Sequence, residues 1–261
     1  METLELLRLL CFFAVLALLA IIEQFVPKRM MSRDKLKRWA CNIGLTLFNT
    51  VLVKLLVPAT TMSVAWYANE QGWGLLQYTQ WPIWLTYLVA IVVLDLAIYW
   101  QHRCFHAIPS LWRLHSVHHS DHDIDVSTAL RFHPLEICLS LGFKLVIVLL
   151  LGIPAAAIII FEILLNAMAM FNHSNIQLPA PLDRVLRLAV VTPDMHRVHH
   201  SQQAGEIRRN FGFNLSCWDH CFNSYLDQPE NGHQRMNIGL AQYAKQELSF
   251  SDLLRLPFTQ Q

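Results

Sequence analysis

Four long apolar runs divide this chain, and they constrain its fold more than any other feature. They cover about residues 4–26, 42–67, 82–100 and 136–171. As helices, the first three can each cross a hydrocarbon core of roughly 30 Å. Charged residues make up 15% of the chain and its mean hydropathy is +0.33, whereas a typical soluble domain is about 25% charged. The sequence therefore predicts an all-α, multipass transmembrane helical bundle.

The fourth run is too long for one crossing. As a straight helix, residues 136–171 would measure roughly 50 Å. The sequence "GIP" at 152–154 interrupts the run, and a proline inside a helix removes a hydrogen bond and clashes with the preceding turn. We therefore predict a helical hairpin that enters the membrane and returns to the same side.

Lysine and arginine residues predict the orientation, because cytoplasmic loops carry an excess of them. Six of them between Lys28 and Arg38 place the first loop in the cytoplasm and the N-terminus outside. Glu2 and Glu5 lie at the start of the first run and the basic residues follow it, so we expect a retained anchor and no cleaved signal peptide. Loop 69–80 has no lysine or arginine and is expected outside. The hairpin then leaves 101–135 and 172–261 together in the cytoplasm.

Charge and cysteine content narrow the class further. The formal net charge of +1 gives no basic surface for nucleic acid. The six cysteines are scattered, and "CWDHC" at 217–221 lacks the spacing of a zinc ribbon. We expect free thiols in a reducing compartment.

Histidines recur at helical spacing in three segments. "HSVHH" at 115–119 and "HRVHH" at 196–200 share one pattern, and "HRCFH" at 102–106 adds an i, i+4 pair. Residues at i, i+3 and i+4 lie on one face of a helix, so each segment is expected to present its histidines together. The residues are His102, His106, His115, His118, His119, His196, His199 and His200.

This many imidazoles favours two metal ions over one. A single structural zinc site takes four ligands and would leave half of the set unused. Nitrogen ligands suit borderline metals with an open coordination position. Iron is the metal expected for chemistry with O₂.

The motifs and their order resemble the sterol desaturase and fatty acid hydroxylase superfamily of membrane di-iron oxygenases. The segments that carry the resemblance are "DLAIYWQHRCFH", "LWRLHSVHHS", "ALRFHPLE", "FNHSN", "TPDMHRVHHS" and "NFGFNLSCWDHCFNSY". The resemblance implies membrane helices capped by a cytosolic, histidine-rich catalytic domain, with two iron ions (zinc can substitute) bound by the eight histidines. It adds His173 as a further ligand and His133 as a weaker candidate, and it implies oxidation of a lipid C–H bond with O₂ as co-substrate. The expected divisions are 1–89 for the first transmembrane helices and basic loop, 90–225 for the catalytic domain, and 226–261 for a cytosolic tail.

Acidic residues near the histidines are candidates for orienting them. Asp95 lies inside the third apolar run, where a carboxylate is costly and usually functional. Asp95, Tyr99, His102 and His106 follow one helical stripe, so we predict that Asp95 orients a ligand histidine. Glu136 and the group Asp121, Asp123 and Asp125 are alternatives for this role, or they solvate a loop.

The chain carries no sequence motif for a redox cofactor. It has no nucleotide-binding glycine motif, no haem-attachment motif and no cysteine quartet. We therefore expect an external electron donor, either a reductase with a cytochrome or ferredoxin, or a reduced pterin. We expect the carrier to dock at basic residues such as Arg197, Arg208 and Arg209.

Two other classes remain as alternatives. A zinc-dependent membrane hydrolase needs a carboxylate base beside the metal, and "His-Glu-x-x-His" is absent. A metal-binding or transport protein would place its ligands near the bilayer midplane. Within the preferred class, hydroxylation, desaturation and ether cleavage stay open, as do the lipid and the membrane (bacterial inner membrane or endoplasmic reticulum).

The predicted orientation can be tested by cysteine labelling. With single cysteines placed near positions 75, 125 and 230, an impermeant reagent added outside should label the first alone. If positions 125 and 230 were labelled from opposite sides, segment 136–171 would cross once and the histidine segments could not share a site.

Overall fold

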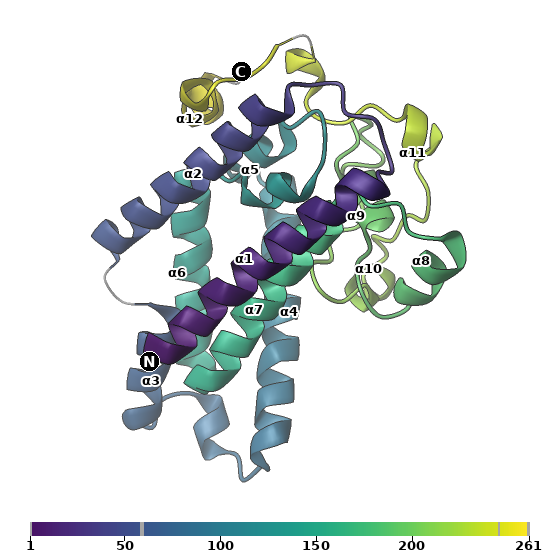
Figure 1. Ribbon diagram of the computed structural model, residues 1–261. Helices are drawn as coiled ribbons and strands as arrows, with labels where there is room; N and C mark the ends of the chain where they lie inside the picture. Colours follow the sequence, from purple (N-terminus) through teal and green to yellow (C-terminus); the bar gives the residue numbers. More distant parts are fainter. Residues whose placement is uncertain (1, 58–59, 245, 260–261) are drawn as a thin grey trace.

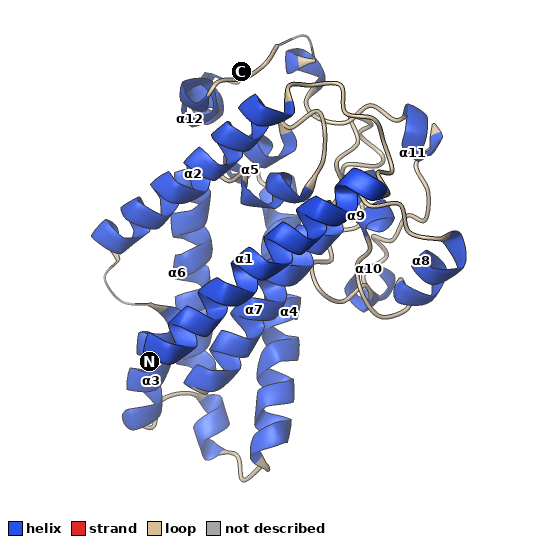
Figure 2. Ribbon diagram, viewed as in Figure 1, coloured by secondary structure: helices blue, strands red, loops and turns tan. Residues whose placement is uncertain are grey.

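The computed structural model describes residues 2–57, 60–244 and 246–259. Throughout these ranges every regular element is a helix (Figure 2). The prediction of an all-α chain is therefore confirmed.

Long apolar helices make up the body of the molecule. Five segments have the length and composition to cross a membrane: Thr3–Phe25, Lys35–Tyr78, Ile83–Ala107, Pro134–Leu151 and Ala155–His173. They contain the helices α1 (Glu2–Phe25), α2 (Lys35–Leu56), α3 (Thr61–Glu70), η1 (Leu75–Tyr78), α4 (Ile83–Ala107), α6 (Pro134–Leu151) and α7 (Ala155–His173). Large apolar side chains on their outer faces are exposed, such as Phe13 at 57% and Leu150 at 64%. A lipid environment covers such faces, and the chain is a multipass membrane protein.

Short helices and loops gather around one end of these long helices, away from the loop between α3 and α4 (Figure 1). We call this part, residues 108–133 and 174–259, the cap. Its helices are α5 (Pro109–His119), η2 (Val126–Leu130), α8 (Ala180–Leu186), α9 (Pro193–His199), α10 (Cys217–Cys221), α11 (Gly232–Arg235), η3 (Ala241–Tyr243) and α12 (Phe250–Thr259).

The fourth apolar run forms the predicted hairpin. Helix α6 ends at Gly152, which has a left-handed conformation (φ 64°) and donates its backbone N–H to Val148 O at 2.9 Å. This conformation favours glycine, and Pro154 then begins α7. A Cβ on Gly152 would lie 2.2 Å from Trp73 O, so the turn also needs glycine to pack against the loop that follows α3.

The second apolar run differs from the prediction of one helix over about 42–67. Helix α2 ends at Leu56, and Val57 lies outside the helical region (φ −131°, ψ 87°). A residue that precedes a proline is pushed out of the helical region, and Pro58 follows Val57 in the sequence. Thr60 then caps α3 by accepting from Ser63 N. Residues 58 and 59 lie outside the described ranges.

Helix α4 packs at the centre of the bundle. Its buried residues Leu94 and Ile98 contact a core that includes Val148 of α6 and Phe161 of α7. Helix α1 lies along α7 (Figure 1). This packing brings the cap ends of α4, α6 and α7 together.

A buried ion-pair network fixes the cap to α2. Arg38 donates from Nε to Asp121 Oδ1 at 2.7 Å and from Nη1 to Asp125 Oδ2 at 3.0 Å. Asp123 accepts from the backbone N–H groups of Ser32 and Arg33. Burial alone raises the pKa of Asp121, but the ion pair and hydrogen bonds with Arg38 outweigh burial and hold that pKa well below its usual range. These three aspartates therefore anchor the loop between α5 and α6.

Replacing Arg38 should destabilise the cap. Arg38→Met leaves two buried carboxylates without their cation, and breaking a buried pair in this way costs about 3 kcal/mol. The melting temperature of the purified Arg38→Met variant should lie well below that of Lys37→Met, a control on the exposed side of α2. Equal melting temperatures would contradict the anchoring role.

Candidate metal centre

Nine histidines from four segments meet at the junction of the bundle and the cap. They come from the last turns of α4, from α5, from the end of α7, and from α9 with its C-cap. All nine are buried, and the most exposed of them, His106, is 7% exposed. They are His102, His106, His115, His118, His119, His173, His196, His199 and His200. These are the nine residues that the sequence analysis predicted as ligands, and their role as ligands stays a prediction.

The nine side chains form two groups. Within each group, one nitrogen from every ring lies within 4.8 Å of those of the others. The first group contains His102, His106, His115, His119 and His199, and the second contains His118, His173, His196 and His200. The groups adjoin each other, because the rings of His119 and His200 stack with centroids 4.3 Å apart.

The structure corrects the expectation that each His-x-x-His-His segment presents its three rings together. In α5, His115 and His119 belong to the first group and His118 to the second. The segment 196–200 shows the reverse division, with its i+3 residue, His199, in the first group. At 3.6 residues per turn, positions i+3 and i+4 point about 100° apart. Each segment therefore serves both groups.

Hydrogen bonds set the tautomer of several rings. The Nδ1–H of His102 donates to Phe211 O at 2.9 Å, and that of His199 donates to Arg209 O at 2.8 Å. His118 and His173 donate likewise to Arg131 O at 3.2 Å and Ala169 O at 2.6 Å, and His115 donates to Glu136 Oε1 at 2.6 Å. Because these oxygens only accept, a neutral ring keeps its lone pair on Nε2, as in metal-binding histidines.

The Nε2 atoms then face each other at close range. His102 Nε2 lies 3.1 Å from His115 Nε2, and His118 Nε2 lies 2.9 Å from His173 Nε2. Two neutral rings with Nδ1–H groups have no hydrogen to share there, so their lone pairs repel. The buried Nε2 atoms of His106 and His199 have no hydrogen-bond partner. A bound cation satisfies all of these atoms, so the residues fit a metal ion in each group.

The charge state of the cap histidines suits metal binding. Burial, followed by the neighbouring histidines, holds the pKa values of His118, His119, His196 and His200 well below 6.5. Burial lowers the pKa of His199 to about 3. These rings are neutral at pH 7, and the neutral imidazole is the form that binds metal.

A buried carboxylate supports the loop that carries two of these hydrogen-bond acceptors. Asp219 accepts from the backbone N–H groups of Phe211 and Gly212, each at 2.8 Å. A Cβ on Gly212 would lie 2.7 Å from Asp219 Oδ2, so the close approach needs glycine. The sequence analysis did not find these contacts, because no motif shows which backbone carbonyls will face a ring.

Three residues that were grouped with the ligands have other roles. Asp95 accepts from Asn214 N, Leu215 N and Trp218 Nε1, which corrects the prediction that it orients a histidine. Tyr99 lies 2.8 Å from Ser224 Oγ and stacks on Phe222. His133 caps α6 by accepting from Leu135 N at its Nδ1. The stripe on α4 that carries Asp95 and the two histidines faces different groups along its length. Its Asp95 end contacts the cap loop at 214–218, so sharing the stripe with histidines does not bring Asp95 to their rings.

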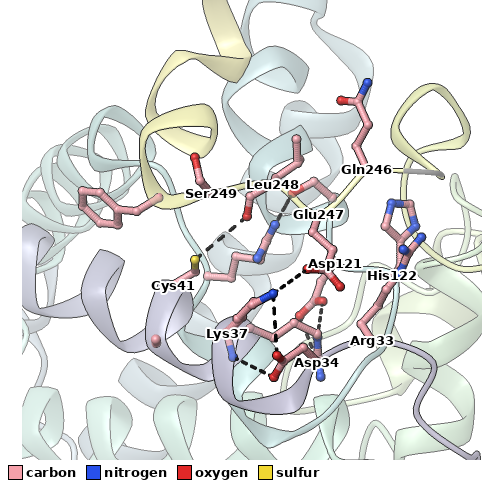
Figure 3. Close-up of a pocket in the computed structure, with 15 residues that line it drawn as sticks. Arg33, Asp34, Lys37, Cys41, Asp121, His122, Gln246, Glu247, Leu248 and Ser249 are labelled. Carbon is pink, nitrogen blue, oxygen red and sulfur yellow. Dashed lines mark hydrogen bonds and ion pairs between the residues drawn. The ribbon is translucent and has the colours of Figure 1, made fainter.

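Glu136 is the acidic residue that orients a histidine, through the hydrogen bond to His115. Asp121 instead lines a pocket of about 420 Å³ in which Lys37 and Asp34 lie opposite Leu248 and Ser249 (Figure 3). None of the nine histidines lines that pocket. Arg197, expected at the surface, is 1% exposed and pairs with Asp194, so it cannot receive a docking partner.

A larger cavity of about 490 Å³ reaches the first group from inside the bundle. His102, His115 and Glu136 line one end. Its walls include Val53, Ile98, Phe105, Leu141 and Leu165, and these side chains come from α2, α4, α6 and α7. A cavity of this size suits a small or chain-like ligand.

The fold and the site define a membrane protein with a buried cluster of nine histidines at one end of its helical bundle. The sequence profile of the fatty acid hydroxylase family matches residues 87–224. That match covers more than half of the chain and all nine histidines, and the chain belongs to this family.

Several curated proteins are similar to the chain. The ornithine lipid hydroxylase OlsE of Rhizobium tropici is 29% identical over 151 residues, which is 58% of this chain and 44% of that protein. The alkylglycerol monooxygenase of Homo sapiens is 30% identical over 150 residues, 58% of this chain and 33% of that protein. The chain thus spans less than half the length of these relatives. No solved structure gives a significant match.

Metal analysis tests the ligand set directly. Protein purified from iron-supplied cells should contain close to two equivalents of metal per chain. His115→Ala and His199→Ala each remove a ligand and should lower that content, whereas His133→Asn, which retains a capping side chain, should not. One steady equivalent in the parent protein, or metal loss in the His133 variant, would contradict the assignment.

Proposed function

We propose that this chain is a membrane-bound di-iron oxygenase that uses O₂ and external electrons to hydroxylate or desaturate a lipid alkyl chain or a sterol-like substrate. The observation that carries the proposal is the cavity, which joins an apolar space among the long helices to the histidines of the first group. A lipid tail in that space would end at the metal centre.

The donor set supports two ions of a borderline metal. The first group offers five imidazoles and the second four, and nitrogen donors suit iron and zinc. Bound iron would supply the reaction of O₂ with a C–H bond. The nine histidines would hold the two ions, with the cap on the cytoplasmic side of the membrane.

The protein's own residues would position the ligands and exclude water. Glu136 holds His115 through Nδ1, and the carbonyls of Phe211 and Arg209 hold His102 and His199 in the same way. Such partners typically change metal affinity or activity 10- to 100-fold. Phe105, Phe132 and Phe213 surround the histidine end of the cavity and would keep bulk water from the reacting carbon.

The balance of the reaction requires an electron donor. Hydroxylation places one oxygen atom of O₂ in the C–H bond and reduces the other to water, which consumes two electrons and two protons. The donor would be a reductase with a cytochrome or ferredoxin, or a reduced pterin. Arg208 is exposed and close in sequence to Arg209, whose carbonyl binds His199, so it remains the basic residue suited to docking.

The relatives support a lipid substrate. Ornithine lipid hydroxylase and alkylglycerol monooxygenase are both named for reactions on lipids. A zinc-dependent hydrolase is a second candidate, because Glu136 Oε2 has no hydrogen-bond partner and lies beside His115. Such an enzyme would turn over lipid without consuming O₂.

Turnover experiments separate these functions. Purified protein given membrane lipid and O₂ alone should stall after at most one turnover. Addition of a reductase with its carrier, or of a reduced pterin, should give many turnovers with matching O₂ consumption. Sustained oxidation without a reductant would contradict the need for a donor, and lipid cleavage without O₂ would favour the hydrolase. Arg208→Glu should slow electron delivery and leave metal content unchanged.

A further inference from the structure

The end of the cavity remote from the histidines is charged. Arg8, Lys54, Lys144 and Glu162 line it, and Glu162, with no role in the sequence analysis, is 5% exposed. Charged residues among membrane-spanning helices are costly and usually mark a functional site. This end therefore calls for an explanation beyond packing.

The contacts of Glu162 leave the site with excess positive charge. Its Oε1 accepts from Thr61 Oγ1 at 2.6 Å and from Lys144 Nζ at 3.2 Å, and its Oε2 accepts from Arg8. Arg8 also pairs with Glu5 at 2.8 Å, so three cations share two carboxylates, and Lys54, which is exposed, has no ion-pair partner among the described residues. An ion pair that only holds two helices together, which we call a structural clamp, would need one cation for each carboxylate.

We propose that Arg8, Lys54 and Lys144 bind the anionic head group, a carboxylate or a phosphate, of an amphiphile whose alkyl chain runs through the cavity to the first group of histidines. The amine of a cationic head group is disfavoured, because Glu162 already accepts three hydrogen bonds. The proposal rests on the proposed function for the chemistry at the other end. The binding itself requires neither metal turnover nor O₂.

The helix α6 sets the length of the site. Lys144 lies about two turns beyond Glu136, or about 12 Å along the helix axis. An extended chain advances about 1.2 Å per single bond, so roughly ten bonds separate the head group from the carbon beside His115. The anchor would therefore select which methylene is oxidised.

The apolar wall between the two ends fits this occupant. Val53, Leu141 and Leu165 line it, and they offer contact to methylene groups without polar partners. The side chain of Lys144 is 19% exposed and that of Arg8 is 37% exposed, so an anion bound between them would be partly removed from water. Ion pairs in such surroundings are stronger than at a surface.

Binding of three probes in uncharged maltoside micelles tests the anchor: hexadecanoate, hexadecyl phosphate and hexadecanol. Native mass spectrometry should show either anion bound about tenfold more tightly than the alcohol. A preference for hexadecanoate indicates a fatty acid as the source, and a preference for hexadecyl phosphate indicates a phospholipid. Equal binding of all three probes would overturn the proposal.

Variants distinguish an anchor from a structural clamp. Arg8→Gln and Lys144→Gln should each weaken binding of the anions about tenfold and leave hexadecanol binding unchanged, while Arg8→Lys and the surface control Lys37→Gln should bind as the parent does. Glu162→Gln removes the competing carboxylate and should tighten anion binding. A clamp predicts the reverse for Glu162→Gln, with weaker binding of every probe. If the chain binds the anions but oxidises no lipid, the anchor stands and the proposed function fails.

Discussion

Several imidazoles at the junction of bundle and cap direct their lone pairs toward one another in one buried space, and a positive charge between them would relieve the repulsion. The Nδ1–H groups of His118 and His173 both donate to backbone carbonyls, and the Nε2 atoms of the two rings lie 2.9 Å apart. Burial also keeps the cap rings neutral, so protons do not supply the charge. The rest of the structure holds these rings in place, and under the proposed function a metal ion in each group would lie between their lone pairs.

That task explains why buried carboxylates occupy so much of the cap. Asp219 accepts a hydrogen bond from the backbone of Phe211, and Asp95 on α4 accepts one from the backbone of Asn214. The aspartates around Arg38 fix the loop between α5 and α6. Each carboxylate acts on backbone or on a cation at some distance from the rings. Removal of any one of them would leave other buried polar groups unpaired, which is costly.

The cavity links this rigid centre to the bundle. Its histidine end is built from α4, α5 and α6, and its charged end from α1, α2, α6 and α7. Because α6 contributes Glu136 to one end and Lys144 to the other, a single helix connects the histidine end of the cavity with its charged end. The position of a bound alkyl chain would then follow from the spacing of residues along α6. No side chain would need to recognise a particular carbon of the alkyl chain.

The sequence by itself determined the class of the molecule and indicated which histidines gather at its candidate site. Apolar runs of membrane length and a break at Gly152–Pro154 indicated the long helices and the hairpin, since both depend on local chemistry, although the second run divides after Leu56. Tertiary structure decided how the rings divide into two groups, because that depends on how α5 and α9 are rotated toward each other. It also decided that Glu136 contacts a ring while Asp95 does not, and that Arg197 is buried. The spacing of residues in the sequence shows which of them share a helix face. Only the packing of the helices and loops shows which residues that face contacts.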